Sequence, residues 1–260
     1  MSRLWAEPLS LGLDQDGVAL LRGSAELLFD GPPAVAGLAD TLAATGTTVR
    51  NRLLAPTLGV TVADRLVRYW LVQPPANIAS LAALRAVTAA RFEQLFGETA
   101  QNWRMDADWS AKQAFLACAL PATLCADVER LAAVHGWRLA TMLPAFVRAL
   151  NLAGRQASGW FCMGEGLGLS YAAIQQGRWL CMRSIRFAQP PSQAELLAKL
   201  EGEARLLALS HEQLPEDIRW QGSAAWLPRD SRFGPWRSSF LATQASGSAA
   251  HRLALLGSKT

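Results

Sequence analysis

The stretch GWFCMGEGLGLSYAAIQQGRWLCMRSIRF, residues 159–187, has the most distinctive pattern in the chain. It predicts a strand, a loop with four glycines within ten residues, a second strand, a Gln-Gln-Gly turn and a third strand. Glycine-rich loops that follow a strand can bind phosphate through their main-chain N–H groups. The first question that the sequence raises is therefore whether this loop holds a phosphate.

The composition predicts a compactly folded protein. Hydrophobic residues make up 51% of the 260 residues, which is enough for one large or two modest cores. No apolar run is long enough for a membrane helix, and the first residues, MSRLWAEPLSLGLDQDG, lack the apolar region of a signal peptide. We therefore expect a cytoplasmic protein, or one that is peripheral to a membrane.

Neither the cysteines nor the basic residues indicate a metal or nucleic-acid site. The four cysteines form no C-x-x-C pair and lie in apolar segments, which favours reduced core thiols. The net charge is +4, but the arginines are scattered rather than clustered. Arginine alternates with aromatic residues only in the tail from residue 215 onward, which we expect to be a solvated, loop-rich surface.

Two short apolar runs near the start of the chain, residues 9–13 and 18–22, are separated by Asp-Gln-Asp-Gly. An Asp-Gly pair between two such runs predicts a hairpin, because a type I′ turn requires positive φ at both central residues. We therefore predict a two-residue turn at Asp16 and Gly17, with Gly17 left-handed. The sequence further predicts a strand at 25–29, a helix near 34–44 and strand-like segments at 47–54 and 61–72.

The rest of the chain alternates between helix and strand patterns. The sequence predicts a helix at about 81–96 between Ser80 and Gly97, a strand at 114–120, a helix at 122–134, a strand at 137–141 and helices at 144–152 and 192–209. Residues 9–29 and 159–187 are both three-strand meanders with glycine in the first link, and each precedes a helix. This repeat predicts a duplicated α/β fold with mixed sheets.

The order of these elements resembles the actin-like ATPase superfamily, whose lobes are ribonuclease H-like. Within it the chain is most similar to the family of the type IV pilus assembly protein PilM, together with the cytoplasmic domain of the type II secretion protein GspL and with MshI. The resemblance covers roughly residues 9–210 and is carried by LSLGLDQDGVALLR, by VRYWLVQPP with LAALRAVTAARFEQLFG, by FLACALPATLCADVERLAAVHGWRLATMLPAFVRALN and by the opening stretch.

The resemblance implies a domain organisation. We expect an α/β protein with two actin-like lobes at residues 1–158 and 159–260, mixed sheets, and a small βαβ subdomain inserted at about 66–120. The second lobe is expected to be truncated, because the family's late glycine pair, which holds the adenosine, has no counterpart in the Ser/Trp/Arg-rich tail.

The resemblance also bears on whether the glycine-rich loop holds a phosphate, because each lobe of the family opens with Asp-x-Gly and a Ser/Thr-rich loop. The first lobe has Asp14 and Gly17, but its loop is about two residues too short and lacks a hydroxyl group. In the second lobe Cys162 stands at the Asp position, Gly164 is retained and Glu165 lies inside the loop. A thiol cannot replace a metal-binding oxygen, and a carboxylate would repel a triphosphate. We predict vestigial nucleotide loops, with no cofactor and no metal.

Other catalytic motifs are missing from the sequence. It contains no GxxxxGK[ST], no GxGxxG and no GxSxG, and its three histidines lack the spacing of metal ligands. We therefore expect a degenerate pseudo-ATPase rather than an enzyme.

Three functions compete at this point. The favoured one is a non-catalytic scaffold or adaptor of a type IV pilus or type II secretion assembly platform, located in the cytoplasm and peripheral at the inner membrane. The alternative is a nucleotide-binding actin-like ATPase. The second alternative is a nucleic-acid-binding module that uses the aromatic and arginine-rich tail.

The resemblance implies a partner as well. Related proteins bind the N-terminal cytoplasmic tail of an inner-membrane assembly protein, PilN-like, beside the inserted subdomain, and an assembly ATPase is a further candidate partner. An extended tail would pair with a strand edge. We predict that edge at Arg68, Tyr69 and Trp70, with Arg68 available for an acidic or carbonyl group. The alternative is that Trp70 packs in the core and Arg68 is solvated.

Overall fold

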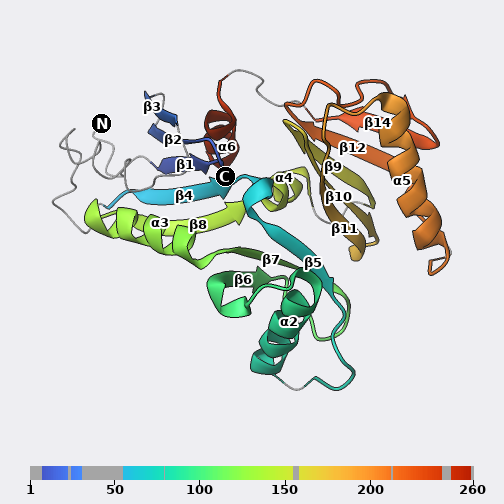
Figure 1. The fold of residues 1–260 in the computed structure, drawn as a ribbon, viewed down its shortest axis with the longest axis horizontal. Helices are drawn as coiled ribbons and strands as arrows, with labels where there is room; N and C mark the ends of the chain where they lie inside the picture. Colours follow the sequence, from blue (N-terminus) through green and yellow to red (C-terminus); the bar gives the residue numbers. More distant parts are fainter. Residues whose placement is uncertain are drawn as a thin grey trace, which may run out of the picture.

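The computed structural model describes residues 8–22, 25–30, 55–78, 80–154, 158–211, 213–241 and 247–258, with the backbone alone for 25–30. The helix predicted near 34–44 and the strand predicted at 47–54 lie outside the described residues. The described part of the chain forms two lobes, each built on a mixed sheet, and a smaller subdomain with a sheet of its own (Figure 1).

The sheet of the first lobe has the strand order β3-β2-β1-β4-β8. Its strands are β1 (Leu9–Leu13), β2 (Gly17–Arg22), β3 (Ala25–Asp30), β4 (Thr57–Val62) and β8 (Arg138–Pro144). The first three form an antiparallel meander, and β4 and β8 run parallel to β1. Every residue of β1 is buried, which is typical of a central strand covered on both faces.

Two helices that follow strands in this part of the chain are α3 (Ala122–Val134) and α4 (Ala145–Ala153). Both match the predicted ranges to within about a residue at each end, which is the usual uncertainty of helix boundaries. The C-terminal helix α6 (Ala249–Gly257) also belongs to this lobe in space, because it packs on β1, β2 and β4 (Figure 1).

Close backbone contact holds α6 on the sheet. A Cβ atom at Gly12 would lie 1.9 Å from the carbonyl oxygen of Ala250, so only glycine fits at this position of β1. The buried guanidinium of Arg148 on α4 donates to the carbonyl oxygen of Gly257, 3.4 Å away, at the carboxyl end of α6. A cation is favourable there, because the last carbonyl groups of a helix carry partial negative charge.

The inserted subdomain consists of β5 (Arg68–Val72), α2 (Leu81–Phe96), β6 (Trp103–Ala107) and β7 (Phe115–Pro121). Its three strands lie in the order β5-β7-β6, and both pairings are antiparallel. β5 and β6 therefore run in the same direction on either side of β7, so β5-α2-β6 is a split βαβ unit with an additional antiparallel strand between its two parallel strands. The prediction omitted β6, although its short WRMDA run alternates apolar and polar residues as a half-buried strand does, with the polar positions exposed.

Two local predictions in this region have different outcomes. The helix α2 is confirmed with its caps, since the side chain of Ser80 accepts a hydrogen bond from the N–H of Ala83 and Gly97 ends the helix with a φ of 67°. The strand-like segment predicted at 61–72 is interrupted by the 3₁₀ turn η2 (Asp64–Leu66), which turns the chain from β4 into β5.

The second lobe repeats the arrangement of the first. Its sheet has the order β11-β10-β9-β12-β14-β13 and contains β9 (Gly159–Glu165), β10 (Gly168–Gln175), β11 (Arg178–Arg186), β12 (Asp217–Gly222), β13 (Arg232–Phe233) and β14 (Trp236–Phe240). The first three form a meander, and β12 and β14 run parallel to β9. The helix α5 (Gln193–Ala208) covers one face (Figure 1). The predicted duplication with mixed sheets is confirmed.

The arginine- and aromatic-rich tail is not the loop-rich surface that the sequence predicts. It supplies β12, β13, β14 and α6, and Trp220 and Trp236 are buried in the core of the second lobe with Trp160. The two residue types alternate because successive side chains of a strand point to opposite faces, so that Trp220 is buried while Arg219 is only partly so.

One hydrophobic core extends across both lobes, and the second lobe has a further core of its own. Phe161 and Met163 on β9 belong to the same cluster as the buried residues of β1, β4 and α4. The ring of Phe161 meets that of Phe146 edge-on, with centroids 5.2 Å apart. Trp160 and Cys162, on the other face of β9, belong to the separate core under α5.

Candidate functional site

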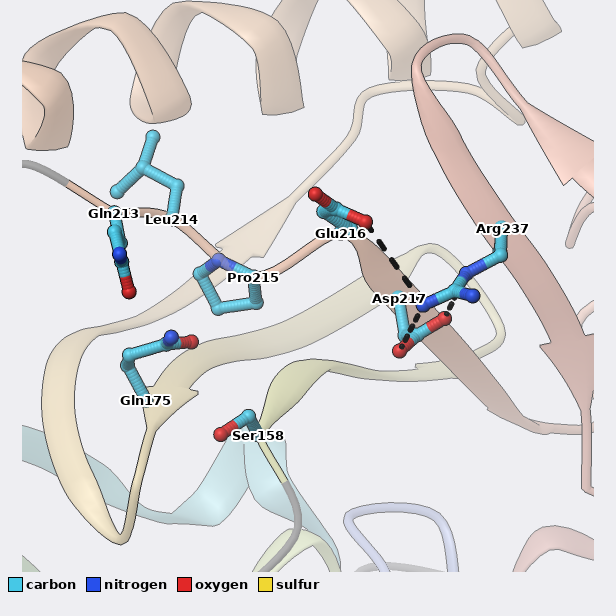
Figure 2. Close-up of a pocket in the computed structure, with 8 residues that line it drawn as sticks. All are labelled: Ser158, Gln175, Gln213, Leu214, Pro215, Glu216, Asp217 and Arg237. Atoms are coloured by element: carbon cyan, nitrogen blue, oxygen red, sulfur yellow. Dashed lines mark hydrogen bonds and ion pairs between the residues drawn. The ribbon is translucent and has the colours of Figure 1, made fainter.

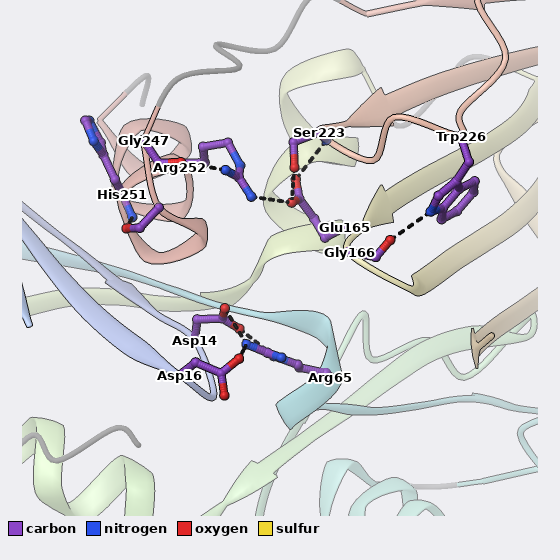
Figure 3. A network of polar contacts seen from close by, with 11 residues as sticks. Asp14, Asp16, Arg65, Glu165, Gly166, Ser223, Trp226, Gly247, His251 and Arg252 are labelled. Atoms are coloured by element: carbon purple, nitrogen blue, oxygen red, sulfur yellow. Dashed lines mark hydrogen bonds and ion pairs between the residues drawn. The ribbon is translucent and has the colours of Figure 1, made fainter. Parts of the chain in front are cut away.

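The two hairpin turns predicted to be vestigial nucleotide loops lie at the carboxyl ends of β1 and β9 (Figure 3). In open α/β sheets this is the end of the strands where ligands bind. The surroundings of these turns therefore form the candidate site.

The first turn differs from its prediction. The N–H of Asp14 donates to the carbonyl oxygen of Gly17, 2.9 Å away, so Gln15 and Asp16 form the centre of the turn. None of these four residues has a positive φ. The predicted turn at Asp16 and Gly17, with Gly17 left-handed, is therefore wrong, because the turn is centred one residue earlier and Gly17 is the first residue of β2.

The carboxylates of the first turn are bound to an arginine of η2. Nε of Arg65 donates to Asp14 over 2.6 Å, and its Nη2 donates to Asp16 over 2.8 Å. Burial alone would lower the pKa of Arg65, but the hydrogen bonds and charges of the two aspartates outweigh it and raise the pKa. Asp14 is buried, so a metal ion could bind its carboxylate only by displacing the guanidinium.

The second turn is held by residues far away in the sequence. The Glu165 carboxylate accepts hydrogen bonds from the N–H of Ser223 (3.1 Å), from the hydroxyl of Ser223 (2.6 Å) and from Nη2 of Arg252 (3.1 Å). The indole N–H of Trp226 donates to the carbonyl oxygen of Gly166, 2.8 Å away, and Gly166 is left-handed with a φ of 55°. Figure 3 shows the glutamate between the serine and the arginine.

The other two residues of the predicted second loop have packing roles. Cys162 is fully buried under α5, where burial raises the pKa of its thiol well above the usual value. A Cβ atom at Gly164 would lie 2.7 Å from a methyl group of Leu227, and one at Gly222 would lie 2.0 Å from the carbonyl oxygen of Gly164. Glycine is thus required here by the close approach of β12 and the segment after it.

Sequence reasoning missed Arg65, Ser223 and Arg252. Arg65 lies in the η2 turn, which was read as strand, and the other two lie in the segment that was read as a loop-rich tail. The sequence did contain a signal for Ser223. It directly follows the run DIRWQG, which has the pattern of a strand ending in glycine and lies late in the second lobe, where the family has its glycine pair. The structure places Gly222 at the end of β12, followed by Ser223 rather than by a second glycine.

Asp64 of η2 connects the lobes with the inserted subdomain. Its Oδ1 accepts hydrogen bonds from the hydroxyl of Tyr69 (2.6 Å) and from the N–H of Phe146 at the start of α4 (2.9 Å). Burial raises the pKa of this carboxyl group, and the hydrogen bonds from Tyr69, Phe146 and Ser170 act in the opposite direction. Asp64 therefore joins η2 to β5 and to the start of α4.

The predicted partner-binding residues all have contacts within the chain. Trp70 is buried and its ring lies 5.3 Å from that of Phe92, and Tyr69 is bound to Asp64. Arg68 donates to Glu98 over 3.1 Å and lies over the ring of Trp103. The alternative interpretation is confirmed for Trp70, whereas Arg68 is paired with a glutamate. β5 is an edge strand of its own sheet, and β11 lies beside it.

A polar hollow occupies the opposite end of the second lobe (Figure 2). Ser158, Gln175 and Gln213 line it together with an ion pair in which Nε of Arg237 lies 2.8 Å from Asp217. Ser158 precedes β9 and Asp217 begins β12, so the hollow lies at the amino ends of these strands. The hollow therefore lies at the opposite end of the strands from the two turns, and a ligand bound at the turns would not reach it.

The described residues lack two kinds of feature. No helix among them is long and apolar enough to span a membrane. The same residues contain no group of three or more His, Cys, Asp or Glu side chains that could hold a metal ion.

Comparison with known proteins gives structural matches. No protein-family model matches the sequence, and no curated protein is significantly similar to it. A chain of the PilM-PilN type IV pilus biogenesis complex matches with a TM-score of 0.61 at 12% identity, over 97% of this chain and 98% of that one.

Two further solved structures match over nearly their whole length. The cytoplasmic domain of EpsL, an inner-membrane component of the type II secretion system of Vibrio cholerae, has a TM-score of 0.54 at 11% identity, over 98% of this chain and 95% of that one. A Bacteroides thetaiotaomicron protein with an actin-like ATPase fold and unknown function has a TM-score of 0.55 at 9% identity, over 96% of both chains. The chain therefore has the actin-like ATPase fold, and the structures that it resembles include components of pilus biogenesis and type II secretion.

Proposed function

We propose that the protein is a non-catalytic scaffold or adaptor of a type IV pilus or type II secretion assembly platform, and that it works in the cytoplasm at the inner membrane. The fold supports this proposal, since similar structures occur in a PilM-PilN complex and in the cytoplasmic domain of a secretion component. The observation that carries the non-catalytic part is that internal ion pairs occupy both hairpin turns.

The ion pairs argue against nucleotide chemistry. A nucleotide-binding actin-like site needs a free carboxylate for the metal and open loops for the phosphates, but Asp14 is bound to Arg65 and Glu165 is bound to Arg252. The remaining loop residues, Gly17, Cys162 and Gly164, lie in strands or are used for packing. In this proposal the second lobe is a shortened version of the nucleotide-binding lobe, and the loops are vestigial.

Nucleotide titration tests the non-catalytic part. We expect no saturable binding of a fluorescent ATP analogue with Mg²⁺ below about 1 mM, a threshold that corresponds to about 4 kcal/mol. Saturable binding below that concentration would contradict the proposal and favour the alternative, an actin-like ATPase. The second alternative, a nucleic-acid-binding module, has lost its main support because the aromatic residues of the tail are largely buried.

The proposed partner is the extended N-terminal cytoplasmic tail of a PilN-like inner-membrane protein, and an assembly ATPase is a second candidate. We place the tail at the inserted subdomain, where Arg68 and Glu98 form a half-exposed ion pair beside the ring of Trp103. An acidic group of the tail can replace Glu98 on the guanidinium, while Tyr69 and Trp70 act as the rigid support of the strand. Pairs as exposed as this one contribute little stability, so the exchange costs little.

Calorimetry with synthetic N-terminal tails of membrane proteins encoded nearby tests this placement. We expect one tail to bind the wild type and the control Arg91→Glu, which makes the same charge change on the exposed side of α2, but not Arg68→Glu. Binding that survives Arg68→Glu would rule out this site and leave the adaptor role standing. If no tail binds at all, the adaptor role itself is contradicted.

A further inference from the structure

The Glu165 carboxylate is surrounded by the kinds of group that bind free oxyanions. A main-chain N–H and a hydroxyl, both from Ser223, and the guanidinium of Arg252 donate to it. Main-chain N–H groups, serine hydroxyls and arginines are the usual donors to phosphate and carboxylate ligands. The N–H of Ser223 reaches the glutamate because Gly222 adopts a φ of 120°, which favours glycine.

These donors come from different parts of the molecule. Glu165 ends β9 and Ser223 follows β12, so both belong to the second lobe, whereas Arg252 lies on α6, which packs on the sheet of the first lobe (Figures 1 and 3). The side chains of Glu165 and Arg252 are 33% and 19% exposed. Such a pair is screened less by water than a surface ion pair.

The site has more donors than the glutamate uses. The Arg252 guanidinium gives Nη2 to Glu165 and Nη1 to the carbonyl oxygen of Gly247, 2.7 Å away. Its Nε is buried and has no hydrogen-bond partner in the described part of the chain. Neither Glu165 nor Gly247 therefore satisfies all the donors of this guanidinium.

We infer that Ser223 and Arg252 form an oxyanion-binding site whose resident anion is the chain's own Glu165 carboxylate. This internal anion links the second lobe to α6 and the first lobe, in addition to the hydrophobic core that the lobes share. When the carboxylate is removed, the same donors are free to bind a small oxyanion such as acetate or phosphate. The inference goes beyond the adaptor role and does not depend on any partner.

An ordinary exposed salt bridge is the competing interpretation, and it predicts something different. Exposed pairs contribute little to stability, and their donors return to water when one partner is lost. An oxyanion site keeps its geometry, because Ser223 is fixed by the backbone and Arg252 by α6. Free anions should therefore compensate for the loss of Glu165 but not for the loss of Glu201, which pairs with the exposed Arg205 within α5.

The first measurement is the melting temperature of the full chain in sodium acetate or sodium phosphate, against sodium chloride at the same ionic strength. We expect Glu165→Ala to melt below the wild type, by about 2–4 °C for each kcal/mol lost in a chain of this size. Acetate or phosphate should restore this loss in a saturable way, with the concentration dependence of a single site. Wild type, Glu201→Ala and the double variant Glu165→Ala/Arg252→Ala should show only the general salt effect.

The two anions distinguish the chemistry of the site. Restoration by acetate alone indicates a site shaped for a carboxylate, and restoration by phosphate alone indicates one that accepts a tetrahedral anion. Either result supports the inference. It is overturned if both anions shift Glu165→Ala and the double variant equally.

The second measurement is amide hydrogen exchange, which reports on lobe closure. Glu165→Ala should accelerate exchange in α6 and at the end of β9, and acetate or phosphate should slow it again, while Glu201→Ala should leave both segments unchanged. If Glu165→Ala does not fold, Glu165→Gln keeps the side-chain shape without the charge and should show the same acceleration. Unchanged exchange in the folded glutamate variant overturns the inference.

Discussion

The two hairpin turns arise from similar sequence patterns, but their acidic residues are bound to different parts of the molecule. Asp14 in the first turn is bound to Arg65 of the same lobe, whereas Glu165 in the second turn is bound to Arg252 on α6, across the boundary between the lobes. The first contact therefore fixes a turn within one lobe, and the second joins two lobes. A repeated fold does not imply repeated roles for corresponding residues.

This difference depends on where α6 lies. If α6 were part of the second lobe in space, Glu165 and Arg252 would form another contact within a lobe. The packing of α6 on β1 is thus the feature whose disruption should have the largest effect.

Gly12→Ala tests that packing directly. The new Cβ would lie 1.9 Å from the backbone oxygen of Ala250, and a backbone atom cannot move aside as a side chain can. We expect the free energy of unfolding to fall by about 3 kcal/mol, the upper end of the usual cost of overpacking. The measurement is urea denaturation followed by tryptophan fluorescence.

Gly59→Ala on β4 is the matched control for this substitution. Its Cβ would meet its nearest neighbour, the hydroxyl oxygen of Thr141, at 3.6 Å, which is ordinary contact. It should therefore cost far less than Gly12→Ala. Equal effects of the two substitutions would mean that α6 does not depend on close contact with β1.

The duplicated fold could be predicted from the sequence because its signals are local. The apolar run LSLGL, the meander of the opening stretch and the capped helix between Ser80 and Gly97 each depend on residues close together in the chain. Periodicity and turn residues report such features directly.

The candidate site could be predicted only in part, because it depends on residues far apart in the sequence. Asp14 and Glu165 were identified by their place in the turns, but their partners lie 51 and 87 positions away. Nothing local in the sequence distinguishes Arg252 from the other arginines. The tail was misread for a related reason: its tryptophans pack against β9, a strand that begins more than fifty residues earlier.

Asp14→Asn tests the contact within the first lobe and should have the next largest effect. The asparagine keeps the side-chain shape. It loses the negative charge that compensates Arg65, and it replaces one acceptor oxygen with an NH₂ group. Because hydrogen bonds to charged groups contribute about 1.5–3 kcal/mol, we expect a loss of about 2 kcal/mol in the free energy of unfolding.

Asp16→Asn is the control for the first turn, because Asp16 binds the same guanidinium but its side chain is 79% exposed. We expect the free energy of unfolding to change by no more than about 0.5 kcal/mol, as for most exposed pairs. Neither Asp14→Asn nor Asp16→Asn should change amide hydrogen exchange in α6, which distinguishes the Asp14 contact from that of Glu165. If Asp14→Asn accelerated exchange in α6, the proposed difference between the two turns would be contradicted.

The smallest expected effect tests whether the two turns differ in backbone conformation. Gly166 is left-handed with a φ of 55° and has open space where a Cβ would lie, so Gly166→Ala changes the backbone energy and little else. A left-handed alanine costs about 1 kcal/mol or slightly more. Gly166→Asn should cost less, since asparagine tolerates this region better than other residues with a side chain. Gly17 at the end of the first turn has no positive φ, so this backbone cost is absent there and Gly17→Asn should bring no gain over Gly17→Ala. Chemical denaturation of the four variants measures the difference between Ala and Asn at each position. If Asn were better tolerated than Ala at position 17 as well as at position 166, the assignment of an ordinary turn to residues 14–17 would be wrong.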